Sequence, residues 1–255
     1  MAEAGLSAQS IVTYSRVVKI VVASAVDKEG EQIYPRKWNH DFIGLPIVDP
    51  KKQRRPTVTK AELEEIIASS KMRWALLFAF MAATGLRIGE AVAVKTEDLS
   101  EDCTILNINR SIWHGQEQAP KTPNAVRVID IPEELASVLQ QHFAGKAGYL
   151  FSTKDGKPLQ QRNVLRVLHA TGKKVGSHVF RRFRTETLRR ARVPEDLISL
   201  WEGRAKQSVT DLYALGLHKD EAWRREWCEK AGLGFSLAGL LGLQNAVEAA
   251  EEVAA

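Results

Sequence analysis

Apolar residues recur at helical spacing near the start of the chain, over residues 7–27, and Ser7 stands where a helix N-cap is expected. These apolar residues form one face of the predicted helix and are Ile11, Tyr14, Val18, Val21, Val22 and Ala25. One helix cannot bury its own apolar face, so the pattern also predicts a packing partner for this helix. Residues 28–58 then carry four prolines and predict an irregular linker.

A second pattern begins at TKAE (59–62), which forms a capping box. Thr59 can cap a helix there while the Glu62 side chain reaches back to the Thr59 backbone. From this point, stretches with helical spacing of apolar residues alternate with stretches rich in β-branched residues. Gly85 is expected to end the second helix. In chain order they predict helices over 60–69 and 71–84, strands within 103–114 and 125–132, a helix over 132–143, a short strand at GYLF (148–151), and helices from there to the end.

These elements predict an α+β fold that is mainly helical and has one small antiparallel β-sheet. The chain of 255 residues is long enough for one large domain or two smaller ones. The apolar stretch FSLAGLLGL (235–243) either packs on its own domain or docks onto a neighbouring protomer, and the sequence leaves both open.

Composition and charge exclude several classes of protein. Lys and Arg number 36 against 31 Asp and Glu, and the net charge of +5 alone argues only weakly for a polyanionic partner. Cys103 and Cys228 are far apart and match no metal-ligand spacing, so neither a zinc site nor a disulfide framework is expected. No apolar run reaches the ~18 residues of a membrane span, and the first residues do not follow the order of a signal peptide. We therefore expect a soluble cytoplasmic protein.

The strongest concentration of charge is the predicted helix HVFRRFRTETLRRAR (178–192), which has six arginines and one acid, Glu186. Its predicted buried stripe comprises Phe180, Phe183, Thr187 and Ala191. That leaves the arginines, Arg184 among them, on the remaining faces. Guanidinium groups so close together repel unless anions neutralise them, so we expect a phosphate-binding face. The alternative is a solvated helix whose arginines pair with distant acids.

The linker ends in a second cationic cluster, KKQRR (51–55). One interpretation is a strap along a phosphate backbone, in which Lys51, Lys52, Arg54 and Arg55 contact DNA. The other is a solvated linker, and the residues alone do not decide between them.

Three blocks of sequence together resemble a known family. They are TGLRIGE (84–90), HVFR (178–181) and Tyr213, which follows Arg181 by 32 residues (213 − 181). In this order, with a lysine on an intervening hairpin, the set resembles the tyrosine recombinases, also called the phage integrase family. The resemblance covers about residues 57–235. It implies a catalytic domain over 51–235, a remnant of a helical core-binding domain plus linker over 1–50, and a C-terminal helix or tail over 236–255.

The resemblance also implies roles for individual residues. Arg87 and Arg181 match the two arginines that clamp the scissile phosphate, where fixed cations stabilise the charge of the transition state. Lys121 resembles the lysine that protonates the departing 5′ oxygen, and His178 a phosphate ligand or assistant in proton transfer. Tyr213 would attack the phosphorus and leave a 3′-phosphotyrosyl bond.

Four further positions qualify this picture. Glu90 matches the family's acidic position and is expected to orient Arg87, although an exposed helix carboxylate is the alternative. Arg182 stands where a histidine is common. Arg204 follows Arg181 by 23 residues (204 − 181), where the family has His or sometimes Trp. Arginine can still donate to a phosphate oxygen, but it cannot transfer a proton. Glu202 replaces what is usually an apolar residue.

Taken together, the resemblance implies a site-specific DNA recombinase that needs no metal and no other cofactor. Its partners would be double-stranded DNA and further protomers, as a tetramer on DNA and a monomer in solution, and it would associate with the nucleoid. The alternative is an impaired or truncated integrase that only binds DNA. An RNA- or partner-binding helical protein with incidental motifs would leave Arg87, His178, Arg181 and Tyr213 scattered in space. A type IB topoisomerase shares the chemistry, but the spacing of the boxes favours the recombinase.

Overall fold

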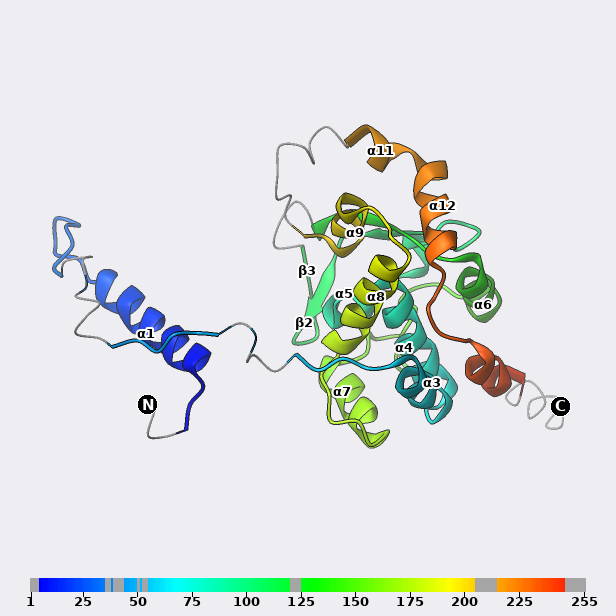
Figure 1. Cartoon of the computed structure of the whole chain (residues 1–255), viewed down its shortest axis with the longest axis horizontal. Coiled ribbons are helices and arrows are strands. Elements are labelled where there is room, and N and C mark those ends of the chain that lie inside the picture. Colours follow the sequence, from blue (N-terminus) through cyan, green and yellow to red (C-terminus); the bar gives the residue numbers. More distant parts are fainter. Residues whose placement is uncertain are drawn as a thin grey trace. The chain divides into compact units, whose positions relative to one another are not determined.

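A computed structural model describes residues 5–34, 38, 44–49, 51, 55–119, 125–204 and 215–245 (Figure 1). The chain divides into two compact units, Met1–Arg55 and Pro56–Ala255, and each is described by itself.

The N-terminal unit contains helix α1 (Ala8–Ala23), which confirms most of the helix predicted over 7–27. Ser7 caps it by accepting a hydrogen bond from the Ser10 N–H at 3.1 Å. The helix ends at Ser24, and Val26 instead forms a β-bridge with Gln32. None of the α1 side chains is buried, so the expected packing partner of its apolar face is not found among the described residues.

The second unit begins with helices α3 (Lys60–Ala68) and α4 (Met72–Thr84), close to their predicted bounds. The capping box is present: the Glu62 N–H donates to Thr59 Oγ1 at 3.2 Å, and the Thr59 N–H donates to Glu62 Oε2 at 2.9 Å. Helix α4 is buried from Ala75 to its last residue and ends at Gly85, whose φ of +68° favours glycine. It forms the centre of the hydrophobic core.

Among the described residues, four short strands form two antiparallel pairs instead of the single predicted sheet. β1 (Ile105–Ile108) pairs with β4 (Arg127–Asp130), and β2 (Ser111–Trp113) pairs with β3 (Gln116–Gln118). The predicted segments 103–114 and 125–132 therefore contain strands, but β3 was not predicted because its QEQ sequence has no apolar alternation and is fully exposed. The predicted GYLF strand forms only a bridge between Lys95 and Tyr149, next to Gly148 in the left-handed region.

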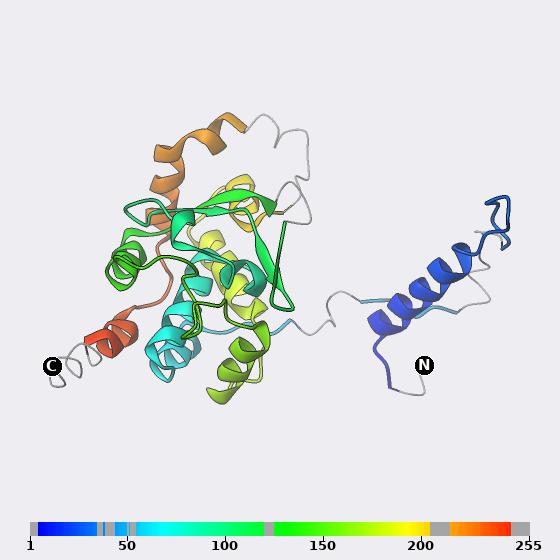
Figure 2. The ribbon, with the colours of Figure 1, turned by 180° about the vertical axis from the view of Figure 1, so that it is seen from behind.

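The remaining elements surround α4 and the strands (Figure 2). They are α5 (Ile88–Ala91), the 3-10 turn η2 (Thr96–Asp98), α6 (Glu133–Phe143), α7 (Gln161–Ala170), α8 (His178–Arg190), α9 (Glu195–Glu202), α11 (Leu215–Lys219) and α12 (Glu221–Ala231). Helix α6 confirms the prediction over 132–143. Helix α8 lies beside α4, where the rings of Phe78 and Phe180 stack with their centroids 5.4 Å apart.

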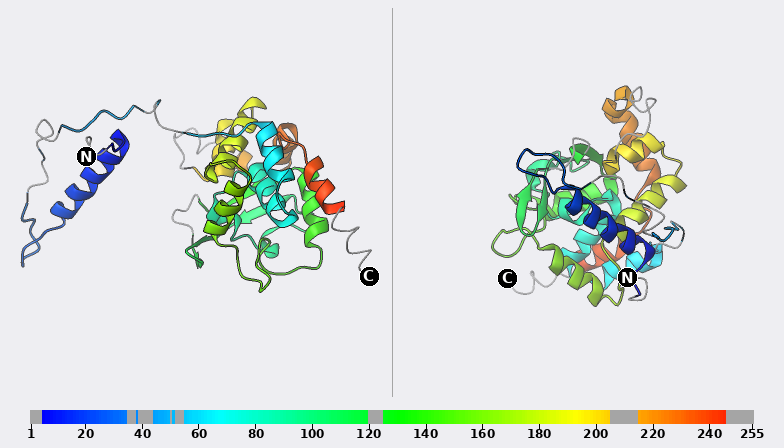
Figure 3. Two further views of the ribbon diagram at one scale, coloured as in Figure 1. Left: turned by 90° about the horizontal axis from the view of Figure 1, so that it is seen from below. Right: turned by 90° about the vertical axis from the view of Figure 1, so that its left-hand side faces the viewer.

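The apolar stretch 235–243 packs on its own unit, which is one of the two alternatives left open by the sequence. Phe235 contacts the ring of Phe183, and Leu237 and Leu240 are buried in the core. Residues 238–245 are helical and lie beside α3 and α6 (Figure 3). The described part of the predicted tail is therefore integrated into the second unit.

Close packing of α5 against β2 depends on Gly89. A Cβ atom there would lie 2.8 Å from the Ile112 carbonyl oxygen and 3.0 Å from Gln161 Nε2. We expect Gly89→Ala to lower the free energy of unfolding by about 1–3 kcal/mol through this overpacking, measured by urea denaturation. Gly176→Ala is the control, since its Cβ would meet nothing within 4 Å. Equal stability of the two variants would contradict the prediction.

Candidate functional site

Several residues predicted for the site line one open cavity of about 450 Å³. They are Arg87 and Glu90 at the start of α5 and His178 at the start of α8. The lining includes Arg87, Glu90, Arg110, Trp113, His178 and Gly203. Lys121 and Tyr213 lie outside the described residues, as do Lys52 and Arg54.

Arg87 and Glu90 are joined at the N-terminus of α5. The Arg87 Nη1 donates to Glu90 Oε1 at 2.9 Å, and the Arg87 N–H donates to Glu90 Oε2 at 3.0 Å. The Arg87 side chain is 44% exposed, whereas that of Glu90 is only 7% exposed. Glu90 is therefore a buried carboxylate that holds an accessible arginine at the edge of the cavity, and not an exposed helix acid.

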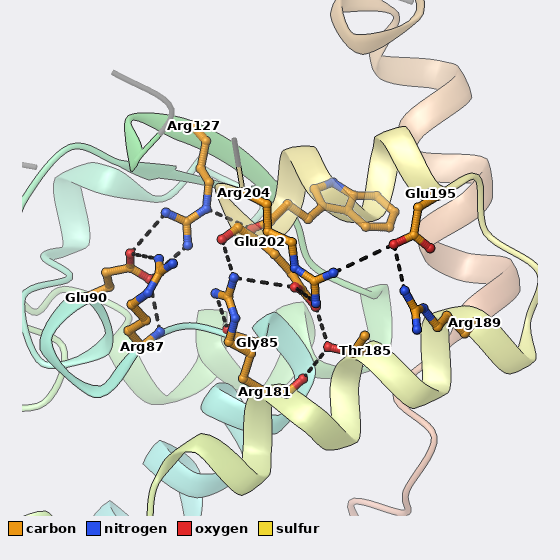
Figure 4. Close-up of polar contacts among 11 residues, drawn as sticks. Gly85, Arg87, Glu90, Arg127, Arg181, Thr185, Arg189, Glu195, Glu202 and Arg204 are labelled. Carbon is orange, nitrogen blue, oxygen red and sulfur yellow. Dashed lines mark hydrogen bonds and ion pairs between the residues drawn. The ribbon is translucent and has the colours of Figure 1, made fainter. Parts of the chain in front are cut away.

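Arg127 was not identified from the sequence, although it organises this corner of the site (Figure 4). Its side chain is 1% exposed, and it contacts both oxygens of Glu90, from Nη1 at 3.2 Å and from Nη2 at 2.8 Å. Its Nε donates to the Trp201 carbonyl at 2.8 Å. Arg127 thus links β4, Glu90 and the end of α9. The available signal was the strand alternation, which places Arg127 on the same face as Ile129 and Ile131.

These contacts keep Glu90 ionised. Burial by itself raises the pKa of the Glu90 carboxyl, but hydrogen bonds and charge attraction from Arg127, with smaller contributions from Arg87, bring it below its usual range. The three side chains therefore form a charged network with a net positive charge.

Arg181 connects three elements from its position on α8. Its Nη1 donates to the Gly85 carbonyl at 3.1 Å and its Nη2 to the Glu202 carbonyl at 2.5 Å. The side chain is 10% exposed. Burial lowers the pKa of the Arg181 guanidinium to about 10, with Glu202 acting in the opposite direction, so it stays charged at neutral pH. Two of its nitrogens are committed to the protein, which fixes the plane of the guanidinium.

His178 begins α8, one turn before Arg181. Burial lowers the pKa of the His178 imidazole, and the charges of Arg181, Arg182 and Arg87 lower it further. The imidazole is therefore neutral at pH 7. The same interactions show that Arg87, His178 and Arg181 lie close together, which counts against an incidental origin of these motifs.

Arg204 is held by acids beside the cavity. Its Nη2 lies 2.5 Å from Glu202 Oε2 and its Nη1 lies 3.7 Å from Glu195 Oε1, while Glu195 also accepts from Arg189 at 2.8 Å. Two of the three positions that depart from the family pattern, 202 and 204, are therefore paired with each other (Figure 4).

Helix α8 does not present its arginines on one surface, which corrects the prediction for Arg184. Arg184 is 3% exposed, and its Nη1 donates to the Gly232 carbonyl at 2.5 Å. Arg182 donates to the Pro56 carbonyl at 2.6 Å. The buried side of α8 is wider than the predicted stripe because arginine stems can pack in a core when backbone carbonyls satisfy the guanidinium. Arg184 is thus not available to DNA in this structure.

The cationic linker is described only in part. Lys51 and Arg55 are exposed. Their role as a strap along DNA remains a prediction.

Metal-ligand clusters and membrane-spanning helices are both absent from the part of the chain that the structure describes. It contains no group of three or more His, Cys, Asp or Glu side chains that could hold a metal ion. None of its helices is long and apolar enough to cross a membrane. Cys103 and Cys228 are both buried free thiols.

Comparison with known proteins places the site in a family context. A prophage ps2 probable integrase of Lactococcus lactis subsp. lactis is 29% identical over 149 residues, 48% of this chain and 39% of that protein. Tyrosine recombinase XerA of Pyrococcus furiosus is 28% identical over 209 residues, 76% of this chain and 66% of that protein. The chain spans less than half the length of the first of these relatives.

Solved structures show the same fold. The Tn1549 transposon integrase, in complex with transposon right end DNA, superposes with a TM-score of 0.60 at 18% identity, over 86% of this chain and 82% of that one. The integrase of mycobacterium phage Brujita superposes with a TM-score of 0.56 at 16% identity, over 89% and 74%. The model of the phage integrase family matches residues 56–214, more than half of the sequence. The chain therefore belongs to the phage integrase family and has the catalytic-domain fold of the tyrosine recombinases.

Proposed function

We propose that this chain is an active site-specific DNA recombinase, which cleaves and rejoins one strand at a time through a 3′-phosphotyrosyl intermediate without metal or ATP. The observation that carries the proposal is the convergence of Arg87, His178 and Arg181. These residues come from boxes far apart in the sequence. Arg87 and His178 line one cavity, and Arg181 lies close enough to both for their charges to interact while it bonds the Glu202 carbonyl, next to the cavity residue Gly203. A cluster of cations with a neutral imidazole suits a phosphodiester.

In the proposed reaction the Tyr213 oxygen attacks the phosphorus, so that a P–O bond to tyrosine forms as the bond to the 5′ oxygen breaks. Arg87 and Arg181 stabilise the charge that develops on the non-bridging oxygens. Lys121 gives a proton to the departing 5′ oxygen, and the phenol proton passes to a base or to water. Attack by a 5′ hydroxyl on the phosphotyrosine reverses these steps. The roles of Lys121 and Tyr213 rest on their positions in the sequence.

Double-stranded DNA and further copies of the chain are the proposed partners, with a tetramer as the species that recombines two duplexes. DNA-bound relatives support the first part: besides the Tn1549 integrase, XerH recombinase bound to palindromic difH superposes with a TM-score of 0.53 at 18% identity. We place the reaction in the cytoplasm, on nucleoid DNA.

The experiment that tests the proposal is covalent capture of DNA. Because the target sequence is unknown, the protein is incubated with a library of nicked suicide duplexes of random sequence, and DNA that survives detergent and high salt on the protein is sequenced. Wild type is expected to retain DNA enriched in one sequence motif. Tyr213→Phe is the control and should retain none.

A second candidate function is DNA binding without cleavage, and the engagement of Arg204 by Glu202 and Glu195 favours it. It predicts duplex binding that weakens steeply with salt, as phosphate neutralisation requires, but equal and minimal covalent capture by wild type and Tyr213→Phe. That result would overturn the recombinase proposal. Absence of duplex binding at low salt would contradict both candidates.

A further inference from the structure

Glu202 is the last residue of α9, and its carboxylate is buried among arginines beside the cavity. The side chain is 1% exposed. Its Oε1 accepts a hydrogen bond from Thr185 Oγ1 at 2.5 Å. Its Oε2 faces Arg204 Nη2 at 2.5 Å and Arg181 Nη2 at 3.4 Å, as ion pairs and not as aligned hydrogen bonds (Figure 4).

Burying an ionised carboxylate in this position costs free energy of solvation, and only its partners in the protein offset that cost. Removing a charge from water is unfavourable unless opposite charges and hydrogen bonds replace the solvent. Here two guanidiniums supply the opposite charge and Thr185 supplies the hydrogen bond. The carboxylate in turn holds Arg204 to the end of the helix on which Glu202 lies, and it adds a second contact to the Arg181 nitrogen already bound to the Glu202 carbonyl.

We propose that Glu202 is a positioning residue for strand cleavage, whose single carboxylate holds Arg181 and Arg204 as one unit beside the phosphate site. Residues 202 and 204 then act as a pair, and the acid at 202 is the counterpart that an arginine at 204 requires. This inference rests on the proposed function, because the reaction that the two arginines would serve is strand cleavage.

The opposite role for the same contacts is a brake, in which the carboxylate competes with a DNA phosphate for Arg204. The two roles predict opposite changes in the cleavage rate when the charge of Glu202 is removed. A positioning carboxylate makes cleavage slower when it is neutralised, whereas a brake makes cleavage faster.

The test is Glu202→Gln, which keeps the size of the side chain and an oxygen for Thr185 but removes the charge. On a captured suicide duplex, the single-turnover cleavage rate is expected to fall on the order of 100-fold, as a misplaced reacting group does. Duplex affinity, measured separately by fluorescence anisotropy, is expected to stay equal or rise, since every arginine remains. A residue that only supported the fold would not produce this split between rate and affinity.

Asp130→Asn is the matched control. Asp130 is also a buried carboxylate with an arginine partner, Arg224 at 2.9 Å, and it accepts a hydrogen bond from Trp201 Nε1 at 2.7 Å. It supports the same helix but does not contact Arg181 or Arg204 through a described ion pair or hydrogen bond. We expect both Asp130→Asn and Glu202→Gln to lower the melting temperature, because each changes a buried carboxylate that has charged partners. The cleavage rate of Asp130→Asn should nevertheless stay within a few-fold of wild type.

A double-mutant cycle tests the pairing itself. If residues 202 and 204 act together, Glu202→Gln should slow cleavage by a smaller factor in the Arg204→Ala background than in wild type, because only the contact of Glu202 with Arg181 is then left to lose. The shifts in melting temperature of the two single variants, measured without DNA, should be non-additive in the same way. Faster cleavage by Glu202→Gln, equal loss in Asp130→Asn, or additive effects would overturn the inference. Absence of a wild-type adduct would overturn the proposed function and with it this role. A wild-type adduct with unchanged Glu202→Gln would overturn the inference alone.

Discussion

Arg127→Met is expected to lower the free energy of unfolding by about 3–5 kcal/mol, because it leaves the buried Glu90 carboxylate without its bidentate partner. Strand cleavage should fall as well, since Glu90 would no longer hold Arg87 in place. Urea denaturation and covalent capture measure the two effects. The double variant with Glu90→Leu should recover much of the stability, because replacing both partners of a buried pair by apolar groups removes the unpaired charge. Its cleavage should stay low.

The same pair predicts a dependence on pH. The pKa of Glu90 is below its usual value in the folded protein, so its contribution to stability is present above about pH 4.5 and is lost as the pH falls through the depressed pKa. In Arg127→Met burial opposes ionisation with one partner fewer, so the folded pKa rises and this contribution disappears. The difference in stability between wild type and variant should therefore be largest near pH 7 and shrink towards pH 4.

Arg224→Met is the matched control for Arg127→Met. Arg224 is also buried, and it pairs with Asp130. The Arg224→Met variant should lose about as much stability as Arg127→Met, while its cleavage per folded molecule stays within a few-fold of wild type. If the two variants lose cleavage equally, Arg127 has no special relation to the site.

Arg181→Lys is expected to slow strand cleavage by about 100- to 1000-fold, the usual cost of removing one fixed donor from a transition-state site. Lysine keeps the positive charge but has no planar fork, so it cannot bond the Gly85 and Glu202 carbonyls together while facing a phosphate. Single-turnover cleavage of a captured suicide duplex measures the rate.

Arg184→Lys serves as its control, one turn further along α8. Arg184 is equally interior but donates to Gly232, away from the cavity. It should cost stability and leave cleavage within a few-fold of wild type. A large loss of cleavage in Arg184→Lys would contradict the assignment of Arg184 to the core, and an unchanged rate in Arg181→Lys would contradict its role at the phosphate.

Local patterns in the sequence were enough for much of the fold. The capping box at Thr59, the apolar run that ends at Gly85 and the helix over 132–143 all appear near their predicted bounds, because caps, glycine and periodicity act within a few residues. The exposed QEQ strand carried no such signal, since its pairing with β2 comes from a short turn and not from burial.

The candidate site, like the fold, was predictable from the sequence only in part. Its chemistry was present in the sequence, since TGLRIGE, HVFR and Tyr213 mark the phage integrase family through residue types at fixed spacing. The sequence did not show where each guanidinium points. An arginine on α8 can bind a phosphate or donate to a backbone carbonyl with the same local sequence.

Tertiary structure decided those directions. It turned Arg184 into the core, bound Glu90 to Arg127 across 37 positions of the chain, and paired Glu202 with Arg204. The physical reason is that a buried charge must find its partner wherever the fold brings one within reach, and that partner is set by packing between distant segments. The sequence by itself thus determined the family and the residues that could do chemistry, while the packing of α4, α8 and α9 determined which of them face the cavity.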